Sequence, residues 1–135
     1  MNSMWLYHGA EFNEELIGSS VAFVYLITNL KTNRKYIGKK LFKFKKTKQV
    51  KTKKKRILVD SDWKDYWSSS EELKKDVSIL GPENFKREIL HLCPNKGTAS
   101  YLEAKEQFAN LVLEQPELWY NAIINCRVHR NHVKI

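Results

Sequence analysis

The chain has 135 residues and a mass of 16.0 kDa, a size that fits one folded domain with a single hydrophobic core. A hydrophobic content of 42%, which includes four Trp, six Tyr and six Phe, argues against an intrinsically disordered protein. Lys and Arg outnumber Asp and Glu by 24 to 15, and the net charge of +9 indicates a polyanionic partner, for which nucleic acid fits better than a membrane.

The first elements that the sequence predicts are an N-terminal arm and a β-hairpin. Residues 1–19 combine aromatic and acidic side chains, which favours a short helix or an arm packed on the body. Residues 21–27 (VAFVYLI) have the β-branched and aromatic composition of a buried strand, and residues 36–44 (YIGKKLFKF) form the returning strand after a polar turn. The hairpin therefore carries Tyr25 on one arm and Tyr36 on the other.

A strongly basic segment follows the hairpin. Nine of the fourteen residues from 43 to 56 are Lys or Arg, and none is acidic. Like charges at this density repel one another, so we expect an exposed loop or an extended ribbon. Because the run interrupts a folded domain, a phosphate-binding insertion is favoured over a solvated loop or a nuclear-localisation-like tract. Residues 57–63 are expected to form another short strand and a turn.

The second half of the chain predicts two helices with a strand between them. Residues 68–81 begin with a capping serine, Ser69 or Ser70, followed by two acids that suit a helix N-terminus. Residues 84–93 are typical of a third main strand, and residues 98–115 of a second helix. The order β-β-basic segment-α-β-α predicts a small α/β sandwich with a mixed or antiparallel sheet.

Two short motifs and their downstream neighbours resemble those of the GIY-YIG nucleases. YIG at 36–38 is intact, whereas FVY at 23–25 stands where the family has Gly-Ile-Tyr, and the eleven-residue step between the two tyrosines matches phage members. YWSSSEELKKDVSILGPENFKREIL at 66–90 resembles the helix and third strand of the family. A glutamate-bearing helix and Asn121 in WYNA complete the set.

This resemblance implies the organisation of the chain and its activity. It covers about residues 20–125 of a single domain over 1–135, with terminal arms at 1–19 and 126–135 and a basic insertion at 43–56. It implies a central three-stranded mixed or antiparallel sheet flanked by helices. The implied activity is that of a metal-dependent DNA endonuclease encoded by a phage or a mobile element.

In the family, one hairpin tyrosine takes a proton from water and the other positions it. The resemblance therefore assigns these roles to Tyr25 and Tyr36, with Tyr36 as the first choice for the base. A free phenol has a pKa near 10 and needs nearby cations to serve as a base, and Lys39 and Lys40 follow the motif directly. Gly38 lets backbone or phosphate approach closely, and it equally suits a turn or a bulge.

The resemblance also implies one Glu that binds a single Mg²⁺ or Mn²⁺ ion. Glu106 is the first choice because it shares a helical face with apolar residues and lies fifteen residues before Asn121. Glu103 is the second choice, and a pair of acids near one ion remains open. Mg²⁺ suits one carboxylate with several water ligands.

Many relatives carry an Arg about ten residues beyond the second tyrosine, on a helix, where it holds the scissile phosphate. Here that position is Lys46, and the first Arg after the motif is Arg56. Two alternatives stay open: Arg56 does this work from the far side of the basic tract, or a lysine has replaced the arginine. Lysine supplies a point charge without the bidentate fork of arginine.

Double-stranded DNA is the predicted partner, and double-strand cleavage would need a homodimer or two successive nicks. Lysine contacts are mainly to phosphate and give little sequence preference. We expect His129 and His132 to contact phosphate or lie exposed, not to bind a metal. The predicted DNA-binding residues are Lys40, Lys45, Lys46, Lys48, Lys51, Lys53, Lys54, Lys55, Arg56, Arg127, His129 and Arg130.

Other features bear on the setting of the protein. No apolar run is long enough to cross a bilayer, and residues 1–15 lack a signal-peptide pattern. Cys93 and Cys126 have no metal-ligand spacing, so we expect buried thiols and a reduced, cytoplasmic location. The competing interpretation is a non-catalytic nucleic-acid-binding protein that keeps the nuclease fold. A basic structural protein explains the charge but not the motifs.

Overall fold

The structure is a computed structural model, and it describes residues 4–135 with the exception of the side chains of Lys48 and Val50. Five strands form one sheet in the order β2-β1-β7-β3-β4, and two more form a separate hairpin. The strands are β1 (Trp5–Tyr7), β2 (Ala10–Glu11), β3 (Ala22–Asn29), β4 (Lys35–Leu41), β5 (Lys43–Val50), β6 (Lys53–Asp60) and β7 (Phe85–Cys93), and the α-helices are α1 (Glu71–Leu80) and α2 (Lys96–Ala109). The short 3-10 helices are η1 (Glu14–Ile17), η2 (Trp63–Asp65), η3 (Pro82–Asn84) and η4 (Arg130–His132).

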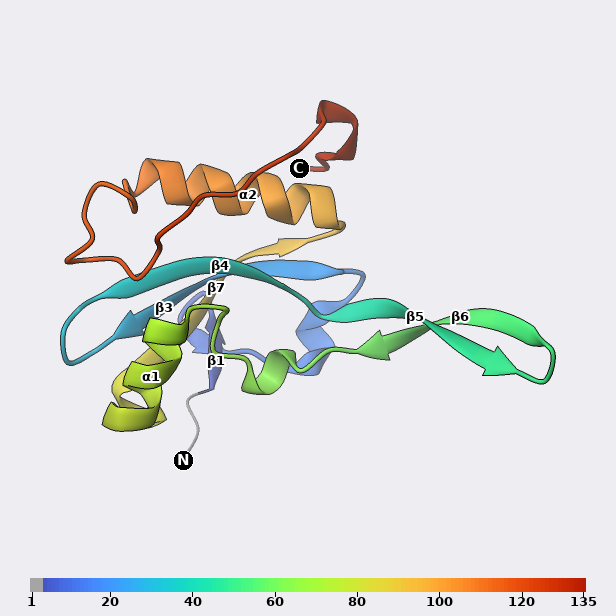
Figure 1. Ribbon diagram of the computed structural model, residues 1–135, viewed down its shortest axis with the longest axis horizontal. Helices are drawn as coiled ribbons and strands as arrows, with labels where there is room; N and C mark the ends of the chain where they lie inside the picture. The colour runs from blue at the N-terminus through green and yellow to red at the C-terminus, as the bar shows by residue number, and fades with distance from the viewer. Residues whose placement is uncertain (1–3) are drawn as a thin grey trace.

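The five-stranded sheet is mixed, as the α/β prediction allows. Its centre is the antiparallel trio β7-β3-β4, and β1 joins β7 in parallel. Helices α1 and α2 cover opposite faces (Figure 1). The predicted α/β sandwich with three central strands is confirmed, and β1 and β2 extend it.

Strand β3 is apolar along its length because both of its faces are covered. Phe23 and Tyr25 point into the layer that holds Leu73 of α1, whereas Val24 points into the layer that holds Ala99 of α2. All five side chains are buried. A run of apolar residues without alternation is the pattern expected of such a central strand.

The N-terminal segment forms strands where a short helix or an arm was expected. Trp5 lies in β1 beside Arg87 of β7, and its Nε1 donates a hydrogen bond to the carbonyl of Trp63 at 2.8 Å. The indole is 3% exposed. The arm does pack on the body, but it does so as a sheet strand because β7 offers an unpaired edge there.

Local interactions explain where α1 begins and where α2 ends. Ser70, one of the two predicted caps, accepts a hydrogen bond from Leu73 N at 3.2 Å and begins α1. The second helix ends at Ala109, six residues short of the predicted end at 115, because Leu111 adopts φ 53. This left-handed residue closes the helix and turns Val112 into the core.

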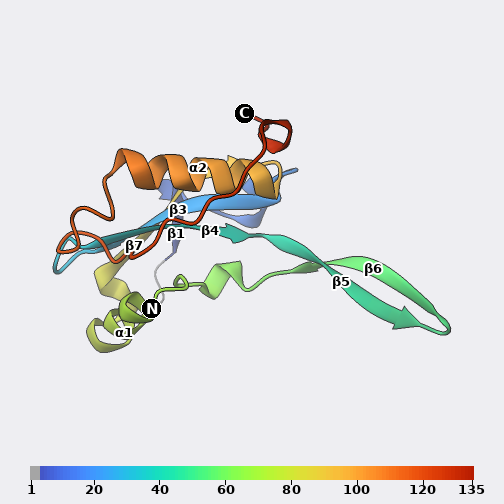
Figure 2. The same cartoon turned by 45° about the horizontal axis from the view of Figure 1, so that its top comes forward.

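The basic segment forms a two-stranded antiparallel ribbon, β5–β6, which agrees with the prediction of an extended ribbon. It projects away from the body in both views (Figures 1 and 2). Strand β6 includes much of the segment 57–63 that was expected to form a separate short strand. Among the described helices, none combines the length and the apolar character that crossing a membrane requires.

Candidate functional site

The two predicted tyrosines lie side by side on neighbouring strands. Tyr25 of β3 and Tyr36 of β4 have ring centroids 6.1 Å apart, and their planes are inclined to each other by 29°. Tyr25 is only 1% exposed, whereas Tyr36 is half-buried. The strand register places Tyr25 directly opposite Gly38. The hairpin therefore brings both phenols to β4, the edge strand of the sheet.

Gly38 is the residue that makes this arrangement possible. A Cβ atom at this position would lie 2.6 Å from Cζ of Tyr25 and 2.8 Å from Cε1 of Tyr36. The ring of Tyr25 therefore crosses β4 in the space that a side chain would occupy. The group that approaches Gly38 is a phenol ring, where the sequence predicted the backbone or a phosphate, and an approach of phosphate stays a prediction.

We expect the substitution Gly38→Ala to destabilise the fold by about 1–3 kcal/mol, because overpacking displaces at least one phenol ring. Urea unfolding at neutral pH would measure the loss. The double variant Gly38→Ala/Tyr25→Phe is the control, since it removes the hydroxyl nearest the new methyl group. It should recover part of the loss, and a further additive loss would contradict the proposed clash.

A third tyrosine, for which the sequence predicts no role, joins the pair. Tyr66 follows η2, and its ring packs edge-on against that of Tyr25 with centroids 6.1 Å apart. Nζ of Lys40 lies 4.1 Å from the Tyr66 centroid and 2.6 Å from Oδ1 of Asp62. Lys40 is thus a cation on the tyrosine face of the sheet. The only sequence signal for Tyr66 is its place just before the serine cap of α1.

The surroundings of the phenols favour their neutral forms. Burial, the nearby Tyr36 and Tyr66, a hydrogen bond with Tyr66 and the charge of Glu103 hold the pKa of Tyr25 well above its usual value. Burial also raises the pKa of Tyr36, although its hydroxyl is 3.2 Å from Oγ of Ser69 and that contact lowers the pKa. Neither phenol ionises readily without additional positive charge.

Of the two predicted acids, Glu103 is the one whose charge acts on the tyrosines, since it adds to burial in raising the pKa of both Tyr25 and Tyr36. Its Oε1 lies 3.9 Å from Nζ of Lys39, which places it on the β4 side of α2. Oε1 of Glu106 instead lies 3.0 Å from Nε2 of His91 on β7. Because β7 and β4 lie on opposite sides of β3, the two acids of α2 point toward different strands of the same sheet face, Glu103 toward β4 and Glu106 toward β7.

Burial and Lys39 act on the pKa of Glu103 in opposite directions. Burial raises its pKa, and the Lys39 side chain and backbone amide act in the opposite direction. Nζ of Lys39 is 3.9 Å from Oε1 of Glu103 and 2.7 Å from Oγ of Ser100. Lys39 therefore supports the acid on the α2 face, and it is not the cation that faces the phenols.

Asn121 holds the backbone between the two motif residues. Its Oδ1 accepts a hydrogen bond from Ile37 N at 3.0 Å, and its Nδ2 donates one to Ile37 O at 2.8 Å. Nε2 of Gln107 donates a second hydrogen bond to the same carbonyl at 3.0 Å. These amides take the place of a neighbouring strand, so Asn121 is a positioning residue for Tyr36 and Gly38.

We expect Asn121→Ala to lower the free energy of unfolding by about 2–4 kcal/mol, because it leaves the buried N–H of Ile37 without its partner. Urea unfolding measures this change. Asn110→Ala is the matched control, since that exposed amide makes a single hydrogen bond, at 2.8 Å, to the carbonyl of Glu106. Equal losses in the two variants would rule out the special role of Asn121.

The structure does not bring Lys46 or Arg56 to the tyrosine pair. Both lie in the projecting ribbon, where Lys46 is opposite Ile57 and Arg56 is opposite Thr47 (Figure 1). The cause is that the insertion folds as a hairpin that leads away from the sheet. Neither Arg56 nor Lys46 is therefore supported in that role, whereas Lys40, a lysine of β4, lies beside the tyrosines and keeps the second alternative open.

Arg87 is a buried cation that supports the site indirectly. Its guanidinium lies 4.5 Å from the Trp5 ring and 4.4 Å from the Trp67 ring, and it donates a hydrogen bond to the carbonyl of Tyr66 at 2.8 Å. Burial lowers its pKa to about 10. Arg87 is 2% exposed and holds the segment that carries Tyr66 in place.

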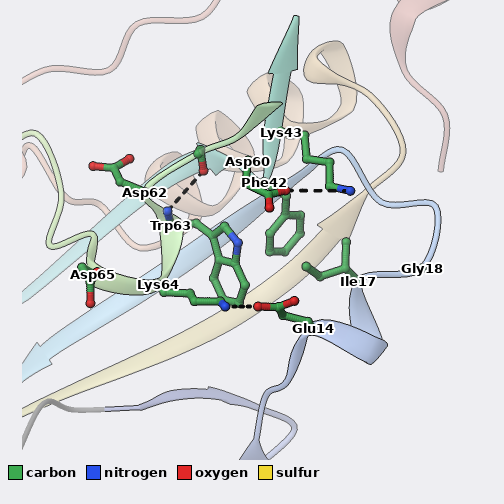
Figure 3. Close-up of a pocket in the computed structure, with 11 residues that line it drawn as sticks. Glu14, Ile17, Gly18, Phe42, Lys43, Asp60, Asp62, Trp63, Lys64 and Asp65 are labelled. Atoms are coloured by element: carbon green, nitrogen blue, oxygen red, sulfur yellow. Dashed lines mark hydrogen bonds and ion pairs between the residues drawn. The ribbon is translucent and has the colours of Figure 1, made fainter. Parts of the chain in front are cut away.

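A basic groove lies next to the Glu103 side of the site. Its volume is about 390 Å³, and its walls include Lys39, Lys40 and Lys96 together with one acid, Asp62, which is paired with Lys40. A different pocket, of about 310 Å³, lies at the base of the ribbon and is lined by four acids and two lysines (Figure 3). The acid-rich pocket suits a polyanion poorly, whereas the lysine-lined groove suits a phosphate chain.

The remaining predicted residues lie in the ribbon and in the C-terminal tail. In the tail, Arg127, His129 and Arg130 are exposed, and Lys134 N donates a hydrogen bond to Oγ1 of Thr98 at 2.7 Å, so this segment packs on α2. In the ribbon, the side chain of Lys48 lies outside the described part of the structure. The other predicted DNA-binding side chains of the ribbon are exposed: Lys45, Lys46, Lys51, Lys53, Lys54, Lys55 and Arg56.

The two cysteines differ in exposure. Cys93 is buried, and burial raises its pKa to about 11. Cys126 is exposed, so the prediction of two buried thiols is wrong for this one, because the tail that carries it lies on the surface of α2. Within residues 4–135, as far as they are described, no group of three or more His, Cys, Asp or Glu forms a metal cluster.

Comparison with known families adds an independent observation. The family model described as "Putative endonuclease segE, GIY-YIG domain" matches residues 5–124. The matched range begins at β1 and ends just after Asn121, so it includes the tyrosines, Gly38, both acids and the ribbon. No curated protein and no solved structure matches the chain.

Proposed function

Because the chain belongs to the GIY-YIG endonuclease family of the segE type, and is by that membership a nuclease, we propose that it hydrolyses phosphodiester bonds of DNA at the edge of β4. The observation that carries this proposal is the packing of Tyr25 and Tyr36 against Gly38 on β4, next to the strand residue Lys39 that contacts Glu103 of α2. These residues come from β3, β4 and α2, so only the folded domain brings them together.

Nucleases of this family generally use divalent metals, and Glu103 fits such an ion. Its side chain is 13% exposed, and burial favours its neutral form, so a bound cation would restore the charged carboxylate. One carboxylate with water ligands suits Mg²⁺, and Mn²⁺ is the alternative ion. When bound, the metal would act as a Lewis acid toward the phosphate and the departing oxygen.

We assign Tyr36 to the attacking water. Its hydroxyl is the more accessible of the two, and the contact with Ser69 orients it. Tyr25 is fully buried and fixes the position of Tyr36 by ring stacking. Because burial keeps the Tyr36 phenol neutral in the free protein, its action as a base depends on added positive charge, and Lys40 is the cation on this face.

The direction of the Glu103 shift sets the expected pH dependence. A raised pKa means that this acid takes up a proton at a higher pH than an ordinary glutamate. Metal binding needs the ionised carboxylate, so activity should rise as the pH increases through that raised pKa and level off above it. Lys39 lowers the pKa, and therefore Lys39→Met should move the acid limb of the pH–rate profile to higher pH. Lys105→Met is the control, because Lys105 is exposed on α2, the helix that carries Glu103. The acid limb of this variant should not move. An unmoved acid limb in Lys39→Met would contradict the role given to this pair.

A plasmid assay tests the proposed activity. Supercoiled DNA with the purified chain and Mg²⁺ should give open-circle or linear product, and EDTA should prevent it. Salt-sensitive binding without cleavage under all metal conditions would instead support the competing non-catalytic protein. The observation that favours this competitor is the FVY sequence at 23–25, which lacks the family glycine.

Several finer points of the proposal go beyond family membership. A nuclease acts on nucleic acid, and we propose double-stranded DNA as the preferred form. One chain carries one such site, so we propose that double-strand cleavage takes a homodimer or two successive nicks. A single domain over 1–135, a phage or mobile-element origin and a cytoplasmic location all stay predictions.

A further inference from the structure

The β5–β6 ribbon (residues 43–60) is the largest charged feature outside the tyrosine site. It projects from the body in both views (Figures 1 and 2). At its base, Nζ of Lys43 lies 3.8 Å from Oδ1 of Asp60. Beyond this pair, the described side chains from Lys45 to Arg56 form no ion pair. The outer part of the ribbon therefore carries a dense positive charge, and residues 45–56 contain no Asp or Glu that could neutralise it.

The register of the ribbon makes this charge costly in the free protein. Along β6, Lys54 and Arg56 share one face of the ribbon, and Lys53 and Lys55 share the other. Like charges crowded on one strand face repel one another, and an isolated two-stranded hairpin is marginally stable at best. A polyanion beside the ribbon would remove this repulsion, so a polyanion is the partner that the charge pattern favours.

The base of the ribbon is fixed to the body. Phe42 is fully buried, and its ring packs against Trp63 with centroids 5.3 Å apart. Ser61 N donates a hydrogen bond to the carbonyl of Phe42 at 2.8 Å, and Oγ of Ser61 donates one to the carbonyl of Leu41 at 2.5 Å. The direction of the ribbon relative to the tyrosine site is therefore set by the core.

We propose that the β5–β6 ribbon enters the major groove of B-form duplex DNA. That groove is about 12 Å wide and admits a two-stranded ribbon. Residues directly opposite each other share a face, so Lys45, Arg56 and Lys54 line one face and Lys46, Lys55 and Lys53 line the other. Basic residues on both faces reach the phosphates of both groove walls. The major groove of duplex RNA is too deep and narrow for this arrangement, and a single strand offers one wall.

The inference also places the ribbon relative to the cut, and this part rests on the proposed nuclease function. Strand β4 leads through Phe42 directly into β5. From Gly38 to Thr47, in the middle of β5, the extended chain spans at most about 30 Å at about 3.3 Å per residue. One helical turn of DNA is about 34–36 Å. The ribbon should therefore contact DNA on one side of the scissile bond, within about one turn.

A binding experiment tests the ribbon separately from catalysis. The ribbon variant is Lys53→Gln/Lys54→Gln/Lys55→Gln, and the matched control removes the same charge as Lys31→Gln/Lys75→Gln/Lys105→Gln, at exposed sites on the body. Fluorescence anisotropy with a 30-base-pair DNA duplex in EDTA measures affinity against salt. We expect at least about tenfold weaker binding for the ribbon variant, with a log–log salt slope shallower by about two to three. The control should stay within about twofold of the parent chain.

Equal losses in the two variants would overturn the inference, because binding would then follow total charge. Methyl green, which occupies the major groove, should displace the protein, and netropsin, which occupies the minor groove, should not. An RNA duplex of the same sequence should bind at least about tenfold more weakly. Displacement by netropsin alone, or equal binding to RNA, would overturn the groove assignment.

The results also separate this inference from the proposed function. A chain that binds DNA through the ribbon but never cuts it upholds the inference and removes the nuclease proposal. A chain that cuts plasmid equally well with and without the three ribbon lysines, at unchanged affinity, removes the inference and leaves the nuclease proposal.

Discussion

Replacement of Glu103 by Gln should abolish plasmid cleavage, with a loss of about 10³-fold or more. The amide keeps the shape of the side chain but removes the negative charge that we assign to metal binding, and a catalytic metal contributes several kcal/mol to transition-state stabilisation. Burial of Glu103 costs free energy in the charged form, so the neutral amide should leave the fold at least as stable. Initial rates of plasmid nicking in Mg²⁺ measure the effect, with thermal unfolding as the check on folding.

Glu106→Gln is the matched control on the same helix. Glu106 contacts His91 on the far side of β3, so its replacement should change the nicking rate by no more than about threefold, well below the about 10³-fold effect of losing a metal ligand. The reverse outcome, with Glu106→Gln inactive and Glu103→Gln active, would show that the site lies at β7 and not at the edge of β4.

Replacement of Tyr36 by Phe should lower the cleavage rate by about 10²- to 10⁴-fold, the range expected when a general base is removed. The ring and its stacking on Tyr25 remain, and only the hydroxyl that contacts Ser69 is lost. Binding of duplex DNA in EDTA should be unchanged, because the variant removes no positive charge. Single-turnover cleavage rates at saturating protein measure the chemical step.

Tyr101→Phe is the control for Tyr36→Phe. Tyr101 is 38% exposed on α2 and should tolerate the change without loss of rate. If Tyr36→Phe keeps the full rate while Tyr66→Phe loses it, the base is Tyr66, and the assignment of Tyr36 falls.

Much of the fold can be predicted from short segments of the sequence. The apolar run of β3 and the serine cap of α1 are properties of short segments, and each appears where the sequence indicates it. Strand β1 has three residues and no alternation of its own. It forms because Trp5 finds a partner in β7, about eighty residues away along the chain, and no local pattern carries that information.

The choice between the two acids shows what a helical-face analysis leaves out. Helix α2 has a polar border on each side of its buried stripe, with Glu103 on one and Glu106 on the other. Spacing along the helix identifies both borders. Which border lies over β4, the strand of Tyr36, depends on the sheet order β7-β3-β4, which is a property of the assembled sheet and not of the helix.

The missing arginine has a similar explanation. Counting ten residues beyond Tyr36 assumes that a helix follows the second motif strand, as the family resemblance implies. Here the chain continues as the β5–β6 ribbon, and Lys46 and Arg56 leave with it. Lys40 stays beside Tyr66 because alternate residues of β4 share the face that carries Tyr36.

The central claim is that one metal ion binds where Glu103 approaches the phenols of Tyr25 and Tyr36. Anomalous diffraction from crystals grown with Mn²⁺ and a short DNA duplex tests it most directly. We predict a single anomalous peak within bonding distance of the Glu103 carboxylate and next to the Tyr36 hydroxyl. A peak at Glu106 and His91, or full density for bound DNA with no metal near Glu103, would contradict it.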